Sequence, residues 1–287
     1  MSPAASHCVL ILGCGDIGRR IGRQHLGPGV EVIGAVRSAA SAAAVAAAGL
    51  VPLRLDLDQP LPPLPCADTV YWCAPPPAEG ETDRRLRAVL TVLRPPAQGL
   101  LYISTSAVYG DCQGRWISEA EPLKPGSGRG RRRLDAELAL RAWSARTGAR
   151  TVVLRVPGIY GPGRLPVERL RRGDPVLREQ DSPYTNRVHA DDLAAACMLA
   201  LRQGEVGAAY NISDGRPTTM SDYLLRCARL LGLPEPPRIA LAEAAATFSP
   251  MLMSFLEESK RLDASRLRAL GWQPRHPDLD EGLPACV

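Results

Sequence analysis

The first two thirds of the chain alternate short apolar runs with amphipathic segments. Apolar runs typical of buried strands are residues 8–12, 30–36, 51–55, 68–74, 100–104 and 151–155. Helical spacing marks the stretch after Gly15 and residues 38–48, 81–93 and 131–147. Strands that alternate with helices of this length predict βαβ units around a parallel sheet. Because such crossovers are right-handed, we expect an α/β fold of the Rossmann type, a doubly wound sheet with helices on both faces.

The rhythm changes after Val156. Prolines punctuate the next 30 or so residues, as is typical of loops. A helix at residues 190–201 and a strand at 210–212 then resume the pattern. Residues 222–231 have helical spacing, and the rest of the tail reads as mixed helix and loop. We therefore expect a smaller C-terminal lobe that caps the sheet.

A glycine-rich turn separates the first strand from the first helix. It reads Gly-Cys-Gly-Asp-Ile-Gly at residues 13–18. Gly13 permits the tight turn, Gly15 lets the backbone approach a pyrophosphate, and Gly18 lets helix and strand pack closely. The helix N-terminus at Asp16 and Ile17 offers free N–H groups and a positive dipole end to the phosphates. The turn predicts a nicotinamide dinucleotide site, and the alternative is a turn with a structural role only.

The end of the second strand distinguishes NADP from NAD. No acidic residue follows Val36 to bind a ribose 2′-hydroxyl, whereas Arg37 can pair with a 2′-phosphate and Ser38 can donate to it. We favour NADP, with NAD as the alternative if Arg37 is only a solvated charge. Asp56 is a candidate acceptor for the adenine amine or a turn aspartate. Further candidate cofactor contacts follow later strands, and they are Ala74, Pro75 and Pro157.

Composition excludes several classes of site and partner. The formal charge of +5 and one arginine cluster at residues 129–133 are too little for a general nucleic-acid surface. None of the eight cysteines forms a C-x-x-C pair, the four histidines are scattered along the chain, and no metal site is indicated. No secretory signal and no apolar run long enough to span a membrane are apparent, so we expect a cytoplasmic protein that keeps its cysteines reduced.

Several motifs beyond the glycine turn match one family. They are residues 104–110 (Ser-Thr-Ser-Ala-Val-Tyr-Gly), 154–163, 187–193, 210–212, 270–272 and 281–283. With these motifs the chain resembles the extended short-chain dehydrogenase/reductases, the group of nucleotide-sugar epimerases and dehydratases. The resemblance spans nearly the whole chain and implies a nicotinamide cofactor and a small-molecule substrate.

The resemblance also implies a catalytic Ser or Thr, Tyr and Lys, and here the chain departs from the family. Thr105 matches the Ser or Thr that bonds the reacting oxygen. The Tyr and Lys positions of the Y-x-x-x-K stretch correspond to Arg129 and Arg133. Arginine stays protonated in proteins, so Arg129 is excluded as a general base. We expect Arg129 to bind an anionic group or polarise a carbonyl and Arg133 to hold ribose or phosphate, as in an atypical branch of the family.

Other side chains are candidates for proton transfer, and they are Tyr109, His189, Tyr160 and Tyr184. We expect His189 to be structural at a helix entry capped by Asp191 and Asp192. Asn186 and Arg187 lie where the family contacts its substrate.

Two functions remain open at this point. One is an NAD(P)-dependent oxidoreductase or epimerase-like enzyme of the atypical branch. Its substrate is a small molecule, for which an anionic group is one option, and a homodimer is an open alternative for its assembly. The other is a non-catalytic NADP-binding sensor or protein-interaction module. The expected division is a dinucleotide-binding domain of residues 1–155 and 186–212 and a substrate-binding lobe of residues 156–185 and 213–287.

Overall fold

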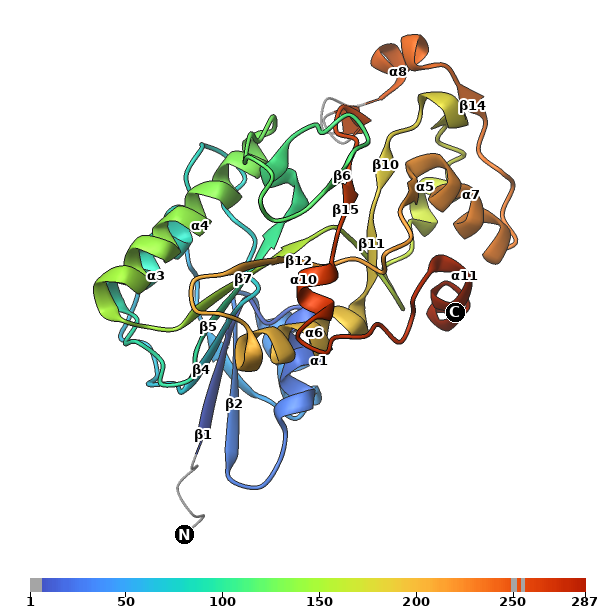
Figure 1. Ribbon diagram of the computed structural model, residues 1–287. Helices are drawn as coiled ribbons and strands as arrows, with labels where there is room; N and C mark the ends of the chain where they lie inside the picture. The colour runs from blue at the N-terminus through green and yellow to red at the C-terminus, as the bar shows by residue number, and fades with distance from the viewer. Residues whose placement is uncertain (1–6, 249–251, 254–255) are drawn as a thin grey trace.

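A seven-stranded parallel sheet forms the centre of the protein (Figure 1). The computed structural model describes residues 7–248, 252–253 and 256–287. The strands follow one another in the order β12-β7-β5-β4-β1-β2-β3, and every neighbouring pair is parallel. Their bounds are β1 His7–Leu12, β2 Val30–Val36, β3 Val51–Arg54, β4 Thr69–Trp72, β5 Gly99–Thr105, β7 Thr151–Val156 and β12 Ala209–Asn211. The predicted doubly wound α/β fold is confirmed.

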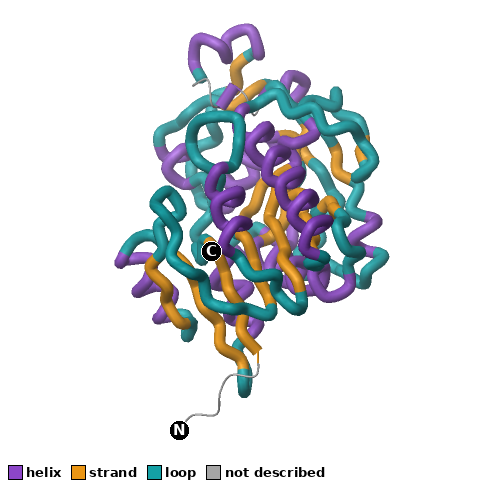
Figure 2. The backbone as a smooth tube through the Cα atoms, turned by 90° about the vertical axis from the view of Figure 1, so that its left-hand side faces the viewer, coloured by secondary structure: helices purple, strands orange, loops and turns teal. Residues whose placement is uncertain are grey.

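Helices cover both faces of this sheet (Figure 2). Alternate residues of β1 enter different cores: Val9 belongs to one apolar cluster and Leu10 to the other. The first cluster includes residues of α1, α2 and α6, and the second includes residues of α3 and α4. Their bounds are α1 Asp16–His25, α2 Ala39–Ala47, α3 Arg84–Val92, α4 Gly128–Thr147 and α6 Ala190–Gln203. Because both faces are covered, the inner strands are continuously apolar rather than alternating.

The strand order reverses at β1, which lies between β2 and β4. The chain winds from β1 outward to β3, then crosses back to β4 and continues to β5 and β7. In open α/β sheets a crevice forms outside the carboxyl ends of the strands at such a switch point. The glycine turn follows β1 and Ala74 follows β4, so both lie at this crevice.

Two helices begin at residues other than those the spacing predicts. The helix expected from residue 131 begins at Gly128, because the Ser127 hydroxyl accepts the N–H of Gly130 and caps it. The helix expected from residue 81 begins at Arg84, where the Asp83 carboxylate accepts the N–H of Leu86. Both caps lie within polar or glycine-rich stretches that carry no apolar periodicity.

The stretch after β7 is more regular than its prolines suggest. It contributes to four two-stranded sheets that pair β8 with β11, β6 with β15, β9 with β14 and β10 with β13. These strands are β6 Trp116–Ile117, β8 Gly158–Tyr160, β9 Val176–Leu177, β10 Tyr184–Thr185, β11 Arg187–His189, β13 Thr218–Thr219, β14 Arg238–Ile239 and β15 Arg261–Leu262. Strands of two or three residues are too short to show a hydrophobic period, so the expectation of loops was wrong here.

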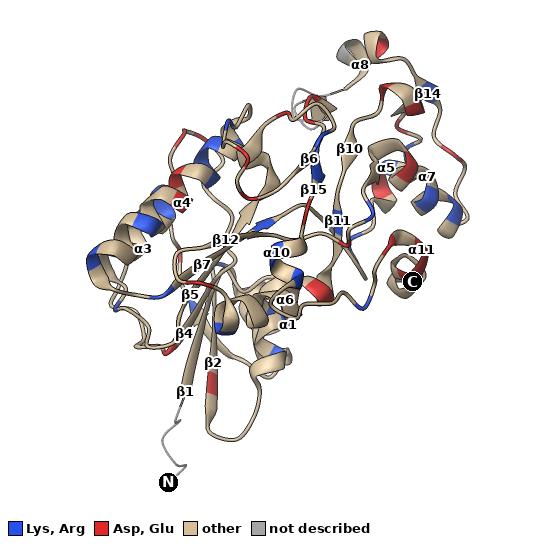
Figure 3. Cartoon of the chain, viewed as in Figure 1, with Lys and Arg blue, Asp and Glu red and all other residues tan. Residues whose placement is uncertain are grey.

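Short helices complete the C-terminal part of the chain (Figure 1). They are α5 Val167–Arg171, α7 Met220–Leu230, α8 Leu241–Thr247, α10 Ser265–Arg268 and α11 Leu279–Gly282, with 3-10 turns η2 Glu179–Asp181 and η3 Pro284–Cys286. A further 3-10 turn, η1 Ser106–Tyr109, directly follows β5. A separate apolar cluster around Tyr160, Leu170 and Leu224 joins α5, α7 and α11. Along α4 a basic first part is followed by acidic and then again by basic residues, and both signs occur in α5 and α7 (Figure 3). Within the described ranges, none of the helices has the length and apolar character needed to cross a membrane.

Candidate functional site

A cavity of about 350 Å³ opens at the carboxyl ends of β1, β2, β3 and β4. Most of the predicted cofactor residues line it, namely Gly13, Gly15, Arg37, Ser38, Asp56, Ala74 and Pro75. Ser41 and Arg85 also line it, although the sequence analysis did not single them out. The structure therefore brings residues from four strand ends into one crevice at the switch point.

The three glycines of the turn each meet a different local requirement. Gly13 has a φ of +79°, and a Cβ there would lie 2.4 Å from the backbone of Ala74. Gly15 has open space above it, since a Cβ would find its nearest atom, the Gly13 carbonyl, at 4.0 Å. Gly18 packs against the first strand, where a Cβ would lie 3.0 Å from Ile11. This is the arrangement that a pyrophosphate-binding turn needs: a tight bend, an open approach and a close helix–strand contact.

Asp16, Ile17 and Gly18 do not line the cavity. Ile17 and Gly18 are buried beneath the turn. The Asp16 carboxylate accepts hydrogen bonds from Arg20 Nε at 3.0 Å and from Arg164 Nη1 at 3.1 Å. Their backbone N–H groups at the start of α1 remain the part of these residues that suits a phosphate.

The far end of this cavity carries the residues that bear on NADP and NAD. Arg37 is exposed, and Ser38 caps α2 by accepting the N–H of Ser41 at 3.1 Å. Asp56 Oδ1 accepts the N–H of Asp58 at 3.0 Å, so Asp56 forms a turn as well as lining the cavity. Hydrogen bonds from Arg85 hold the pKa of the exposed Asp58 carboxyl at about 2. Arg85 is thereby fixed at the cavity wall, where it also donates to the Pro75 carbonyl at 3.0 Å.

A second cavity, of about 190 Å³, lies beside the end of β5. Thr105, Arg129 and Pro157 all line it, so the structure brings these three predicted residues together. Helix α4 approaches η1 closely enough that a Cβ at Gly130 would lie 2.6 Å from the Ala107 carbonyl oxygen. Glycine at position 130 thus allows Arg129 to reach the same cavity as Thr105.

Arg133 lies on the same face of α4 as Arg129 but does not line either cavity. Its Nη1 donates to the Ile103 carbonyl at 2.8 Å and to the Tyr102 hydroxyl at 3.1 Å. A longer contact of 3.5 Å reaches the carbonyl of Ala74, which belongs to the first cavity. Arg133 therefore bridges the ends of β4 and β5, between the two cavities.

Two charged residues of the second cavity were missed by the sequence analysis. Lys260 is 4% exposed, and its Nζ lies 2.6 Å from Glu258 Oε2. The Asn186 amide fixes this segment by donating to the Lys260 carbonyl at 3.0 Å and accepting the N–H of Leu262 at 2.8 Å. The one available signal was compositional, because Lys260 is one of two lysines in an arginine-rich chain, and the other is Lys124.

Three of the four candidate proton-transfer groups have structural partners. The Tyr109 hydroxyl donates to Asn211 Oδ1 at 2.7 Å, and burial raises the pKa of Tyr109 to about 12. The Tyr160 hydroxyl donates to the Asp278 carbonyl at 3.2 Å, and burial raises its pKa as well. His189 is buried, and burial lowers its pKa. Tyr184, by contrast, lines the cavity that contains Thr105.

His189 rather than its acidic neighbours caps α6. Its Nδ1 accepts the N–H of Asp191 at 3.3 Å, so the expected caps Asp191 and Asp192 lie in the first turn instead. The Asp192 carboxylate accepts the N–H groups of Arg275 at 2.7 Å and His276 at 3.0 Å. Two of the histidines are therefore not scattered in space.

The rings of His189 and His276 have centroids 4.0 Å apart. Together with Asp192 they place three possible metal-ligand atoms within 4.8 Å of one another. The two rings are tilted by 55° to each other, and both Asp192 oxygens already accept backbone N–H groups. The geometry is that of a packed junction between α6 and the C-terminal segment.

Comparisons with known proteins agree with this architecture. Residues 82–213 match the model of the NAD dependent epimerase/dehydratase family. The protein YeeZ of Escherichia coli K12 is 31% identical over 180 residues, which are 62% of this chain and 59% of YeeZ. The chain spans at most 60% of the length of the first curated relatives that it matches.

Solved structures match over nearly the full chain. A conserved Silicibacter pomeroyi protein of unknown function is 29% identical, with a TM-score of 0.81 and 98% of both chains covered. UDP-glucose 4-epimerase of Thermotoga maritima, solved with UDP-glucose, has a TM-score of 0.76 over 97% of both chains. At 20% identity the latter shows the fold alone. The glycine turn at the switch point, the shared architecture and the family model that matches residues 82–213 make this chain similar to the NAD dependent epimerase/dehydratase family.

Proposed function

We propose that this chain is an NAD(P)-dependent oxidoreductase or epimerase-like enzyme that uses NADP in preference to NAD and acts on a small molecule. The observation that carries the proposal is the pair of adjacent cavities at the ends of β4 and β5. One cavity contains the glycine turn, and the other contains Thr105. A dinucleotide on the turn would extend toward Thr105, and Arg133 lies between the two cavities.

The residues present suit a dinucleotide with a 2′-phosphate. Gly15 leaves the approach to the turn open. The end of β2 carries no acidic residue of the kind that binds the ribose 2′-hydroxyl of NAD and would repel a 2′-phosphate. Arg37 is exposed at the cavity and would pair with the 2′-phosphate. The Ser38 hydroxyl, which already accepts the N–H of Ser41, would add a donor.

The chemistry follows from which side chains reach the second cavity. The cofactor, when bound, supplies or accepts a hydride. Thr105 would hydrogen-bond the reacting oxygen of the substrate, and Arg129 would polarise it or hold a neighbouring group. Because arginine does not give up its proton, the proton would come from another group, and the Tyr184 hydroxyl is the tyrosine of this cavity.

The replacement of the family's catalytic tyrosine and lysine also supports a second candidate function. Arg129 and Arg133 stand where the family has Tyr and Lys, which favours a non-catalytic NADP-binding sensor or protein-interaction module. Restoring the pair by Arg129→Tyr with Arg133→Lys separates the two functions. Reductase activity of the double variant on a nucleotide-sugar substrate would mean that the scaffold can catalyse and that the natural chain lacks only the base.

We also infer a cytoplasmic location and leave a homodimer through α4 as a prediction. All eight cysteines are unpaired in the structure, which supports a reducing compartment. On α4, Leu138 is an exposed apolar residue that a second subunit would cover.

The first experiment is a calorimetric titration of the purified chain with NADPH and NADH, repeated for Arg37→Asp. We expect NADPH to bind more tightly than NADH. Arg37→Asp should weaken the binding of NADPH by about tenfold or more and leave the affinity for NADH nearly unchanged. Arg146→Asp at the exposed end of α4 is the matched control for the change in charge. Failure of both dinucleotides to bind would overturn the proposal.

A further inference from the structure

We infer that the cavity beside β5 is an anion subsite, and that the substrate carries a carboxylate or phosphate group bound by Arg187 together with Lys260 and Arg129. This inference rests on the proposed function, because it takes the bound anion to be a group of the enzyme's substrate.

Arg187 is a buried arginine that forms no salt bridge among the described residues, although the buried Asp214 carboxylate interacts with its charge at longer range. It is 7% exposed, and its Nε has no hydrogen-bond partner within the described ranges. Its Nη atoms make two long contacts, to the Asn186 carbonyl at 3.5 Å and to Met220 Sδ at 3.4 Å. No ion pair joins Arg187 to any carboxylate of the described chain. Burial accordingly lowers its pKa.

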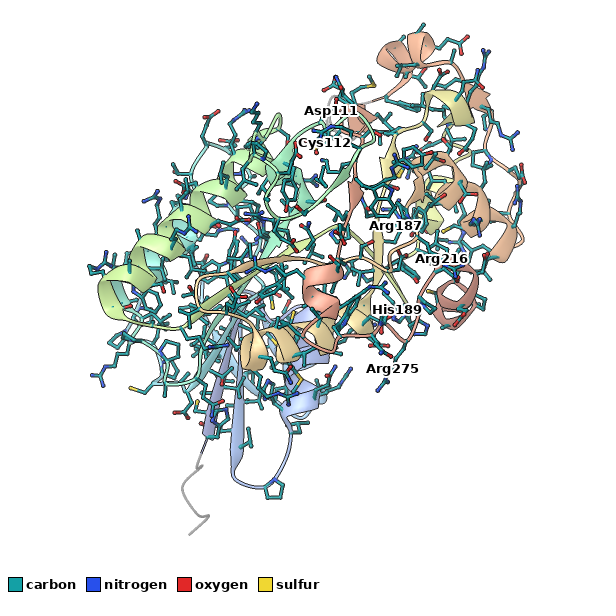
Figure 4. All side chains as sticks on the ribbon, in the orientation of Figure 1. Asp111, Cys112, Arg187, His189, Arg216 and Arg275 are labelled. Atoms are coloured by element: carbon teal, nitrogen blue, oxygen red, sulfur yellow. The ribbon has the colours of Figure 1, made fainter. Side chains whose placement is uncertain are left out.

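The protein nevertheless builds a place for this guanidinium. It stacks on the Tyr223 ring at 4.0 Å from the centroid. A Cβ at Gly158 would lie 1.9 Å from Arg187 Nη1, so glycine at position 158 is what leaves room for the group. Gly158 and Arg187 both line the cavity, and the Arg187 side chain is labelled in Figure 4. A buried charge that is positioned but not neutralised is costly to keep unless a ligand supplies the opposite charge.

The other charged residues of the cavity add to the positive potential. Arg129 and Lys260 line it from α4 and from the segment that enters β15. Glu258 is the single carboxylate among the lining residues that the structure describes, and its Oε2 lies 2.6 Å from Lys260 Nζ. Among the described lining residues three side chains are cationic and one is anionic, so the lining carries an excess of positive charge.

The size of the cavity limits what the anion is attached to. A volume of about 190 Å³ holds roughly six water molecules. This is room for a carboxylate or phosphate with a few further atoms, not for a whole dinucleotide. Arginine binds either group with two parallel N–H donors, so the shared chemistry is a compact oxyanion. Thr105 on the same wall would then bond the reacting oxygen beside that anion.

Glu258 provides a test whose sign distinguishes a binding role from a structural one. If the cavity binds an anion, Glu258→Gln removes a repulsive charge, and we expect binding to tighten by about threefold to tenfold. Lys260→Met leaves Glu258 uncompensated, and we expect binding to weaken by about tenfold or more. If Glu258 and Lys260 are only a structural ion pair, both substitutions would act in the same direction.

The experiment is a calorimetric titration of the full chain with oxalate and, separately, with inorganic phosphate, at low ionic strength. Arg187→Lys keeps the positive charge but removes the planar guanidinium with its two parallel N–H donors. We expect this substitution to weaken the binding of oxalate by about tenfold. Lys124→Met is the matched control, because Lys124 is exposed and lies outside the cavity. Binding of oxalate alone identifies a carboxylate subsite, and binding of phosphate alone identifies a phosphate subsite.

Two results would overturn the inference. One is that neither probe binds at millimolar concentration. The other is that Glu258→Gln and Lys260→Met change the affinity no more than Lys124→Met does, or both weaken it. The same samples are titrated with NADPH to separate this inference from the proposed function. NADPH binding without anion binding removes the subsite and leaves the cofactor proposal, whereas the reverse result removes the cofactor proposal and leaves the subsite.

Discussion

Asp16 at the start of α1 accepts a hydrogen bond of 3.1 Å from Arg164, 148 residues further along the chain. Arg20 binds the other oxygen of the same carboxylate at 3.0 Å. A carboxylate beside a pyrophosphate-binding turn would repel the ligand, and these two arginines neutralise it. The segment after β8 is thereby tied to the turn that follows β1.

Arg164→Gln should weaken dinucleotide binding by about threefold to tenfold, because it leaves Asp16 less well neutralised beside the phosphates. Asp16→Asn should restore the affinity when added to Arg164→Gln. A double-mutant cycle of NADPH titrations measures this coupling. Arg171→Gln, on an exposed arginine of α5, is the control. If the effects of Arg164→Gln and Asp16→Asn simply add, the arginine acts on the cofactor without Asp16.

Gly13→Ala should abolish dinucleotide binding and destabilise the chain by about 2 kcal/mol or more. The φ of +79° disfavours an L side chain, and the new Cβ would meet the Ala74 backbone at 2.4 Å. Urea denaturation measures the loss of stability, and the NADPH titration measures the loss of binding. Gly27→Ala is the matched control, since nothing lies within 4 Å of a Cβ there and its φ is not positive.

Several of the residues that line the cavity proposed for the cofactor could be singled out from the sequence because they belong to local features. Gly13 and Gly18 stand at fixed spacing between one strand and one helix, and Arg37 directly follows the next strand. Thr105 was found through a motif at a strand end. The prediction of α4 as a helix also held, although its N-terminus was three residues off.

The substrate end could not be read in the same way because distant segments build it. Lys260 reaches the cavity through the pairing of β15 with β6, which are two-residue strands 145 positions apart in register. The stack of Arg187 on Tyr223 and the room above Gly158 depend on side-chain placement that has no period in the sequence. His189 and His276 meet only because Asp192 binds the backbone of the C-terminal segment.

Glu137→Ala should destabilise the chain by about 3–5 kcal/mol, because it leaves the buried Arg155 without its counter-ion. The two side chains are each 7% exposed, and Arg155 Nη2 lies 2.8 Å from Glu137 Oε2. Tyr109 also accepts a hydrogen bond from Arg155, at 2.9 Å, so the loss should spread into η1. Chemical denaturation of Glu168→Ala supplies the comparison, since that exposed ion pair on α5 should contribute less than about 1 kcal/mol. Equal effects of the two substitutions would contradict this account.

Asp214→Asn should remove part of the pH dependence of stability between about pH 4 and pH 7. Burial raises the pKa of Asp214 to about 7 in the folded chain, and its Oδ2 has no partner among the described residues. The folded state therefore binds a proton that the unfolded state releases near pH 4, and stability from this group falls as the pH rises toward 7. Above pH 7 the contribution is constant. Denaturation of the natural chain and the variant at pH 4, 5.5, 7 and 8 measures the difference. The free energy of unfolding of the variant minus that of the natural chain should increase from pH 4 to pH 7 and then level off. A difference that is constant across this range would mean that Asp214 is ionised in the folded protein.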